Sequence, residues 1–144
     1  GFDAAVDHQA SDFESRLAEA CPKGIDVYFE NIGGKVLRAV RPLLNDFARI
    51  PVCGLAAQYN TPGENENLAE FMQDILVKRL TWRGFIVSDF QREFSDFLAE
   101  VTPLVTDGRI SFVEDIRKGL EQAPQALIDV LSGRNRGKMV IDLT

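Results

Sequence analysis

Three short stretches of the sequence combine polar side chains with glycine in a way that suits ligand binding. The first ends an alternating apolar run in Asn31, which is followed by Gly33 and Gly34. The asparagine amide both donates and accepts hydrogen bonds, which suits a ribose or a carboxamide, and the glycines allow close backbone approach and positive φ. A βα turn in which Asn31 caps the next helix would explain the same residues without a ligand.

The second stretch, CGLAAQY, changes from apolar residues to small and polar ones. Gly54, Ala56 and Ala57 leave room for a flat ligand. Tyr59 is a polar aromatic residue that could bind this ligand or act only as a packed lid. Cys53 has no basic neighbour, so we interpret it as an inert, buried thiol rather than a nucleophile.

The third stretch places Phe85, Ile86 and Val87 after Gly84. Their side chains are typical of a buried core, while their backbone groups could still face a ligand. In open parallel sheets, ligands bind outside the carboxyl ends of the strands, where all three stretches are expected. The residues therefore favour a nucleotide-like ligand, although the sequence contains neither a G-x-G-x-x-G turn nor a P-loop.

Hydrophobic periodicity predicts alternating strands and helices along the first 108 residues. Strands are expected to start near residues 25, 51 and 82, and a helix follows each of them. This βαβ spacing predicts a parallel sheet. The predicted helix signals are a Ser11–Glu14 capping box for a helix ending near Ala20, Pro42 as a breaker, Asn65 or Asn67 as a cap, and Asp89 as a cap.

The two ends of the chain depart from this rhythm. The opening GFDAAVDH has the pattern of the tail of a short strand. After Gly108 we expect a brief strand over 110–113 and a last strand in KMVIDL. Between them, Pro124 should lie in the first turn of a helix that ends at Gly133.

Composition narrows the class of partner. Sixteen Lys and Arg against 22 Asp and Glu give a net charge of −6, which argues against nucleic acid or an anionic membrane as the main partner. The short basic cluster Arg134, Arg136 and Lys138 is typical of a solvated turn. No run approaches the ~20 apolar residues that span a bilayer, and no secretory signal precedes the first strand.

The number and spacing of the cysteine and histidine residues limit the metal sites and catalytic nucleophiles that can be expected. Cys21 and Cys53 fit a reducing compartment, and we expect a cytoplasmic protein. The sequence has one histidine, His8, and its two cysteines are far apart. This pattern predicts no metal site and no Ser-His-Asp or Cys-His nucleophile.

Five stretches together resemble the zinc-independent medium-chain dehydrogenases/reductases. The closest group is that of the NADPH-dependent alkenal/enone reductases, which includes the leukotriene B4 dehydrogenase, prostaglandin reductase and plant double-bond reductase types. The resemblance covers essentially the whole chain, in order. The stretches are GIDVYFENIGG, PVCGLAAQYN, RGFIVSDF, EDIRKGLEQAPQAL and GRNRGKMVIDL.

The resemblance implies that the chain is the C-terminal half of a longer α/β protein. Family members begin with a GroES-like catalytic domain and continue into a Rossmann domain that opens with its glycine-rich turn. Residues 1–108 would be the rest of that NAD(P)-binding domain, a parallel sheet flanked by helices without its first strands and Gly-rich turn. Residues 109–144 would return to the absent catalytic domain. The 144 residues alone are therefore expected to show little or no turnover.

The resemblance also implies an NADP(H) site. Tyr59 would lie near the nicotinamide and the reacting substrate, as the catalytic residue. His8 stands where the family often has tyrosine near the adenosine end, and its role stays open. The residues implied to bind the cofactor are Asn31, Cys53, Gly54, Leu55, Ala56, Ala57, Gln58, Tyr59, Phe85, Ile86, Val87 and Asn135.

The implied activity is hydride transfer from NADPH to the β-carbon of an α,β-unsaturated aldehyde or ketone. A quinone reductase of the same superfamily is one alternative, and a truncated, non-catalytic domain that binds nucleotide or self-associates is another. A homodimer or higher oligomer is expected, both from the family and because loss of the first strands would expose a sheet edge.

Overall fold

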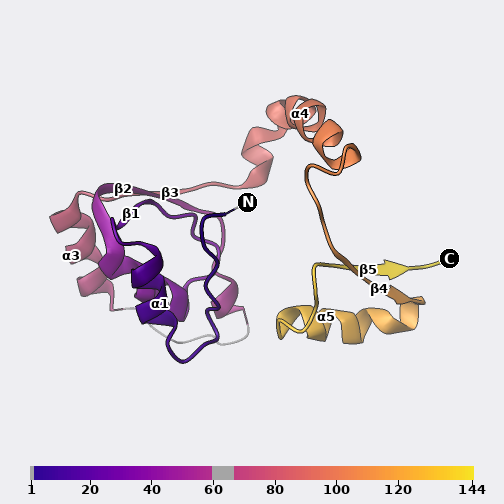
Figure 1. Ribbon diagram of the computed structural model, residues 1–144, viewed down its shortest axis with the longest axis horizontal. Coiled ribbons are helices and arrows are strands. Elements are labelled where there is room, and N and C mark those ends of the chain that lie inside the picture. The colour runs from indigo at the N-terminus through magenta and orange to yellow at the C-terminus, as the bar shows by residue number, and fades with distance from the viewer. Residues whose placement is uncertain (1, 60–66) are drawn as a thin grey trace. The chain divides into compact units, whose positions relative to one another are not determined.

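The computed structural model describes residues 2–59 and 67–144, which form two compact units, Gly1–Asp89 and Phe90–Thr144 (Figure 1). This division falls earlier in the chain than the boundary proposed after residue 108. Each unit is described by itself. In the described ranges, no helix is long and apolar enough to cross a bilayer.

The first unit is an α/β layer built on three parallel strands in the order β1-β2-β3. Ile25 of β1 pairs with Leu44 of β2, and Ile50 of β2 pairs with Trp82 of β3. The predicted βαβ rhythm and parallel sheet are confirmed. The elements are α1 (Phe13–Ala20), β1 (Ile25–Val27), α2 (Gly34–Val40), η1 (Arg41–Leu43), β2 (Leu44–Val52), η2 (Ala56–Gln58), α3 (Leu68–Lys78) and β3 (Thr81–Gly84).

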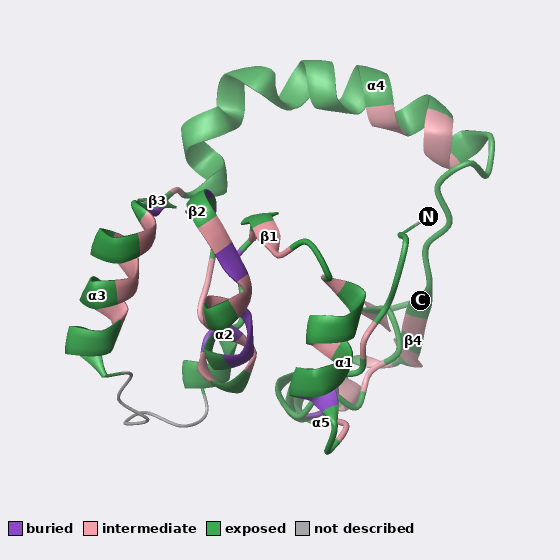
Figure 2. Ribbon diagram, turned by 60° about the vertical axis from the view of Figure 1, so that its left-hand side comes forward, coloured by how far each residue is buried: buried purple, intermediate pink, exposed green. Residues whose placement is uncertain are grey.

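The core of this unit lies between the central strand β2 and the helices, and Figure 2 shows buried residues along β2. Ile50 is 1% exposed. Burying an aliphatic side chain of this size contributes about 1.5–3 kcal/mol. The buried apolar cluster consists of Val40, Leu44, Ala48, Ile50 and Leu80.

Several predicted boundaries of the first unit are wrong by a few residues. Helix α1 begins at Phe13 after Asp12, so Ser11 lies too far upstream for a capping box, and residues 2–8 contain no strand. The strand expected over residues 50–56 runs from Leu44 to Val52, because the chain becomes extended directly after the Pro42 turn.

Other predicted signals are confirmed. Helix α2 ends at Val40, two residues before Pro42. The side chain of Asn67 caps α3 by accepting from the amides of Ala69 and Glu70. Asn65, the other candidate cap, lies outside the described residues.

The second unit contains a parallel strand pair, β4 and β5, joined by a helical crossover. The expected strand over 110–113 is wrong: β4 begins at Glu114, which pairs with Lys138 at the start of β5. Pro124 does lie in the first turn of α5, and Gly133 follows its end with φ 65°. The elements are α4 (Phe94–Thr106), β4 (Glu114–Lys118), η4 (Leu120–Gln122), α5 (Ala123–Leu131) and β5 (Lys138–Asp142).

The segment η3 (Val87–Glu93) leads to α4, and the residue at the N-cap position of α4 is Glu93. The predicted Asp89 cap is therefore wrong. The Asp89 carboxylate accepts instead from the Ile86 amide (3.1 Å), which closes a local turn.

Candidate functional site

The loops that follow β1 and β2 are fastened to each other by main-chain hydrogen bonds. Beyond β1, Glu30 forms a parallel bridge with Val52, the last residue of β2. The Glu30 amide donates to the Pro51 carbonyl (2.9 Å), and the Glu30 carbonyl accepts from the amides of Cys53 (2.8 Å) and Gly54 (3.2 Å). The two polar stretches that follow these strands therefore start side by side at one edge of the sheet.

The contact between the two loops continues past this bridge. The Ala56 amide donates to the Asn31 carbonyl (3.2 Å), and the Ala57 amide donates to the Ile32 carbonyl (2.8 Å). The short η2 turn is thereby held against the turn that carries Asn31. This arrangement brings the first and second predicted stretches together, as expected from the parallel sheet.

Gly54 lies between two polar side chains of the candidate site. A β-carbon on Gly54 would lie 2.7 Å from Oδ1 of Asn31 and 3.5 Å from the hydroxyl of Tyr59. The first distance is shorter than a carbon–oxygen contact allows, so any larger residue would displace the Asn31 amide. Asn31, Gly54 and Tyr59 therefore form one cluster, with the glycine providing the space between the amide and the phenol.

The double glycine serves the backbone. Gly33 and Gly34 have φ of 74° and 51°, which other residues rarely adopt. Gly33, which has no side chain, occupies the N-cap position of α2. The alternative reading in which Asn31 caps this helix is therefore wrong, which leaves the Asn31 amide available at the exposed strand end.

The rest of the second stretch is open to solvent. Tyr59 is 68% exposed, and Ala56, Ala57 and Gln58 are also exposed, while Leu55 is half-buried. The interpretation of Cys53 as buried is wrong: its thiol is free and exposed, because β2 ends one residue before it.

The third stretch is less buried than predicted. Ile86 and Val87 are 68% and 80% exposed, because β3 ends at Gly84 and the chain leaves the sheet there. Phe85 is half-buried and packs edge-to-face on Phe29, with ring centroids 6.0 Å apart. The Phe85 amide donates to Val52, and the Ile86 amide and carbonyl both bond to Asp89.

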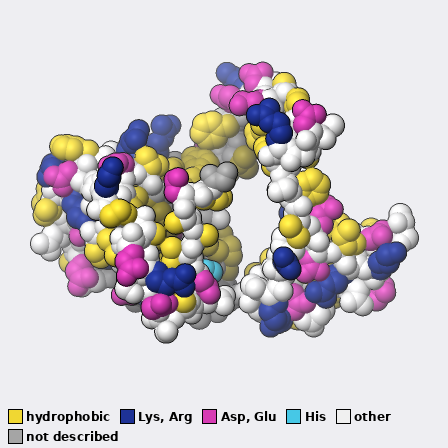
Figure 3. Space-filling model, in the orientation of Figure 1, with side chains coloured by type: hydrophobic (Ala, Val, Ile, Leu, Met, Phe, Trp, Pro, Cys, Tyr) yellow, Lys and Arg dark blue, Asp and Glu magenta, His cyan; other side chains and the backbone are white. Residues whose placement is uncertain are grey.

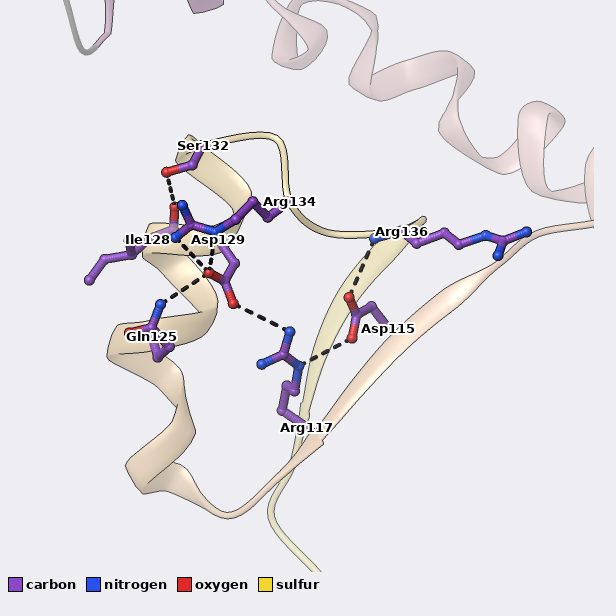
Figure 4. Close-up of polar contacts among 8 residues, drawn as sticks. All are labelled: Asp115, Arg117, Gln125, Ile128, Asp129, Ser132, Arg134 and Arg136. Atoms are coloured by element: carbon purple, nitrogen blue, oxygen red, sulfur yellow. Dashed lines mark hydrogen bonds and ion pairs between the residues drawn. The ribbon is translucent and has the colours of Figure 1, made fainter.

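Asn135 belongs to the second unit. Its side-chain amide donates to the Gly137 carbonyl (2.7 Å), which folds the loop between α5 and β5. Arg134 and Arg136 flank it in the chain. Both are tied to acidic residues of the same unit, Arg134 through its guanidinium to Asp129 and Arg136 through its amide to Asp115 (Figure 4).

Sequence reasoning missed the buried acid of the site. Glu30 is fully buried, and its carboxylate accepts from the hydroxyl of Tyr28 (3.2 Å). Burial is the main cause of a raised Tyr28 pKa, and the negative charge and hydrogen bond of Glu30 raise it further. The available signal was an acid directly before a glycine-rich turn, whose amides need a nearby acceptor.

Two other features bear on ligand binding. His8 is exposed and lines an apolar hollow of about 540 Å³ together with Phe13, Val27, Ile32 and Val36. Within residues 2–59 and 67–144, no group of three or more His, Cys, Asp or Glu side chains could hold a metal ion.

Known proteins with similar sequences include several reductases. The chain is 48% identical over 145 residues to the NADPH-dependent curcumin reductase of Escherichia coli, covering 98% of this chain and 42% of that protein. It is 39% identical over 142 residues to the NADP(+)-dependent 2-alkenal reductase of Nicotiana tabacum, covering 98% and 41%. It also matches the structure of CurA from Vibrio vulnificus in complex with NADPH with 45% identity and a TM-score of 0.91, covering 100% and 44%.

The chain thus spans less than half the length of the relatives it matches. The family model described as zinc-binding dehydrogenase matches residues 1–141, nearly the whole chain. The chain therefore belongs to the zinc-binding dehydrogenase family, and the medium-chain dehydrogenase/reductase membership predicted from its motifs is confirmed.

Proposed function

We propose that the protein containing this chain uses NADPH to reduce the C=C bond of α,β-unsaturated aldehydes or ketones. The observation that carries the proposal is the cluster of Asn31, Gly54 and Tyr59 at the carboxyl ends of β1 and β2. Ligands bind at this edge of open parallel sheets. The names of the similar proteins, which include a curcumin reductase and a 2-alkenal reductase, support the substrate class.

The residues present fit the nicotinamide half of a dinucleotide. Because Gly54 has no β-carbon, the Asn31 amide oxygen can approach the backbone there, and the Tyr59 hydroxyl lies on the same side of the glycine. The Asn31 amide can bond a ribose hydroxyl or the carboxamide. We propose that the binding set is Asn31, Cys53, Gly54, Leu55, Ala56, Ala57, Gln58 and Tyr59, with Phe85, Ile86 and Val87 through their main chain and Asn135 from the second unit.

The main-chain contact at Ile86 is limited by the local turn. Its amide is already bonded to Asp89, and its carbonyl has one lone pair engaged by the Asp89 amide. A carbonyl oxygen can accept two hydrogen bonds. We therefore propose that the carboxamide amino group donates to the second lone pair of the Ile86 carbonyl.

The cofactor, when bound, supplies a hydride for the β-carbon of the substrate. As that bond forms, the C=C electron pair shifts toward the carbonyl, and negative charge develops on the oxygen. We propose that the Tyr59 hydroxyl donates a hydrogen bond to this oxygen; a donor placed where charge develops stabilises the transition state. A proton from Tyr59 or solvent on the α-carbon completes the reduction.

Other parts of the proposal concern the wider protein. Residues 1–108 would belong to the cofactor domain and 109–144 to the catalytic domain. Acidic and basic side chains are interspersed on the face shown in Figure 3, which, together with the net charge of −6, favours a small-molecule substrate over nucleic acid. We place the protein in the cytoplasm, as a homodimer or larger oligomer. Light scattering across a concentration series tests the assembly, and a monomer throughout would contradict it.

Steady-state kinetics of the full-length protein that contains this chain test the activity. Enals, enones and quinones are compared as substrates with NADPH. We expect NADPH oxidation to follow enal or enone reduction, and Tyr59→Phe to lower kcat by at least about a hundredfold, the lower end of the range for removal of one donor to a developing oxyanion. Faster turnover of quinones would support the quinone reductase alternative. Binding without turnover of either class would support a non-catalytic domain.

A further inference from the structure

Glu30 lies directly beneath the candidate site and has no place in the proposed chemistry. In the part of the chain that the structure describes, only Glu30 and Asp129 are buried charged residues, and Glu30 is 0% exposed. Burial of a carboxylate is costly unless its oxygens are hydrogen-bonded. Its presence at this point therefore calls for a specific structural role.

One oxygen of Glu30 holds the turn that carries Asn31. Oε1 accepts from the amides of Ile32 (2.7 Å) and Gly33 (2.8 Å) and from the Tyr28 hydroxyl (3.2 Å). The two amides belong to the residues immediately after Asn31. The main chain that follows Asn31 is thus held by a buried carboxylate.

The backbone of the same residue holds the second loop. The Glu30 carbonyl accepts from both Cys53 and Gly54, so one residue binds the first loop through its side chain and the second through its main chain. The close approach of the Asn31 amide to Gly54 depends on both attachments.

The second oxygen of Glu30 has a different environment. Among residues 2–59 and 67–144, Oε2 has no hydrogen-bond partner, and Glu30 lines a cavity of about 290 Å³ together with Leu37, Val52 and Trp82. An amide nitrogen could replace Oε2 while the other oxygen kept its three donors. Glutamine can therefore reproduce the anchor without the charge.

We propose that Glu30 is a positioning residue: it fixes Asn31 against Gly54 and Tyr59, and thereby sets the affinity for the nicotinamide half of NADPH. This inference rests on the proposed function. It assigns Glu30 no contact with substrate or cofactor, so Glu30 acts only through the geometry of the two loops.

The test is made in the full-length protein that contains this chain. It compares Glu30→Ala, which removes the anchor, with Glu30→Gln, which keeps it. Leu80→Ala is the matched control because it weakens the core of the same unit away from the site. We expect Glu30→Ala to raise the NADPH dissociation constant by at least about tenfold, and Glu30→Gln by less than about threefold. Leu80→Ala should lower Tm with the dissociation constant unchanged. An unchanged dissociation constant in Glu30→Ala would overturn the proposal. An equal rise of the dissociation constant in Glu30→Ala and Leu80→Ala would also overturn it.

Hydrogen exchange separates this proposal from the proposed function, because it needs no cofactor. We expect the amides of Ile32 and Gly33 to lose protection in Glu30→Ala and to keep it in Glu30→Gln. Loss of protection at these amides in both variants would show that the charge, and not the geometry, holds the turn, and would overturn the proposal even if Glu30→Ala does not fold well enough for kinetics. Failure of the wild-type protein to bind NADPH would instead overturn the proposed function, while exchange would still decide whether Glu30 anchors the turn.

Discussion

Among residues 2–59 and 67–144, each of the two units has one buried carboxylate, and the two are stabilised in different ways. Glu30 is held by uncharged donors, two amides and a phenol, all within three residues of it. Asp129 is held mainly by cations: Arg134 contacts its Oδ1 (2.8 Å) and Arg117 its Oδ2 (3.3 Å), while Gln125 adds an amide (3.0 Å) (Figure 4).

Both carboxylates sit beside a turn that presents an asparagine. Asn31 follows Glu30 directly, and Asn135 follows the Arg134 that binds Asp129. A polar turn is thus fixed by neutral hydrogen bonds around Glu30 and by ion pairs around Asp129, whose partner Arg134 is exposed. The two solutions should respond differently to mutation and to pH.

The largest expected effect is on the first unit. Glu30→Ala leaves the amides of Ile32 and Gly33 without an acceptor and opens a cavity, which together should cost about 2–4 kcal/mol. Hydrogen exchange should show this loss in the sheet of the first unit. Equal protection in variant and wild type would mean that solvent replaces the carboxylate, and the contrast between the two anchors would fail.

Asp129→Ala is expected to destabilise the second unit only. Removal of the carboxylate leaves Arg134 without its partner, so the turn before β5 should exchange faster and the melting temperature should fall. Asp96→Asn, on the exposed face of α4, is the control and should change neither. An unchanged turn in Asp129→Ala would contradict the role of these ion pairs.

Acid should act on the same network. The hydrogen bond from Arg134, and then that from Gln125, lower the pKa of Asp129 below its ordinary value of 3.8. A depressed carboxylate pKa stabilises the fold fully above its unfolded value, and this stabilisation is lost as pH falls toward the folded value. Acid unfolding of the wild-type protein should therefore include a contribution below pH 4 from the second unit that Asp129→Asn lacks.

A smaller effect is expected at Gly54. Gly54→Ala pushes the Asn31 amide away while leaving the backbone contacts of Glu30 in place. We expect NADPH binding to weaken about tenfold, or about 1.4 kcal/mol, with little change in Tm. Gly84→Ala is the control, because a β-carbon there has no neighbour within 4 Å. Similar affinities in the two variants would argue against the cluster.

The smallest effect concerns Tyr28. Its raised pKa means that the folded protein keeps the phenol neutral, so stability is full below the ordinary value of 10.0 and falls as pH rises above it. Tyr28→Phe should flatten this alkaline decline and cost little at pH 7. A decline of equal slope in both proteins would show that other groups cause it.

Much of the fold followed from local pattern. The strand starting at Ile25, the Pro42 break, the Asn67 cap and the Pro124–Gly133 pair each rest on neighbouring residues, and each is confirmed. The alternation predicted beyond Ile25 is wrong, because Val27 and Phe29 are exposed and Glu30 is buried. The first and last residues of β2 and β4 could not be predicted from local pattern, because a strand extends as far as its partner strand does. Glu114 is charged yet starts a strand, since Lys138 of β5 lies opposite.

The candidate site was predictable in its exposed parts and not in its support. Asn31 and Gly54 could be placed at strand ends from the parallel pattern alone. Their contact with Tyr59 depends on hydrogen bonds between residues more than twenty positions apart, such as that between Ala57 and Ile32. The burial of Glu30 depends on the same tertiary contacts, so its role could not be read from its neighbours.

The most direct test of the central claim is an NADPH titration of the full-length wild-type protein and of its Asn31→Ala variant. Melting temperatures are measured in parallel. The claim predicts saturable binding to the wild type and at least about tenfold weaker binding to Asn31→Ala at an unchanged melting temperature. Equal affinities in the two proteins would contradict a cofactor site built on the strand ends around Asn31.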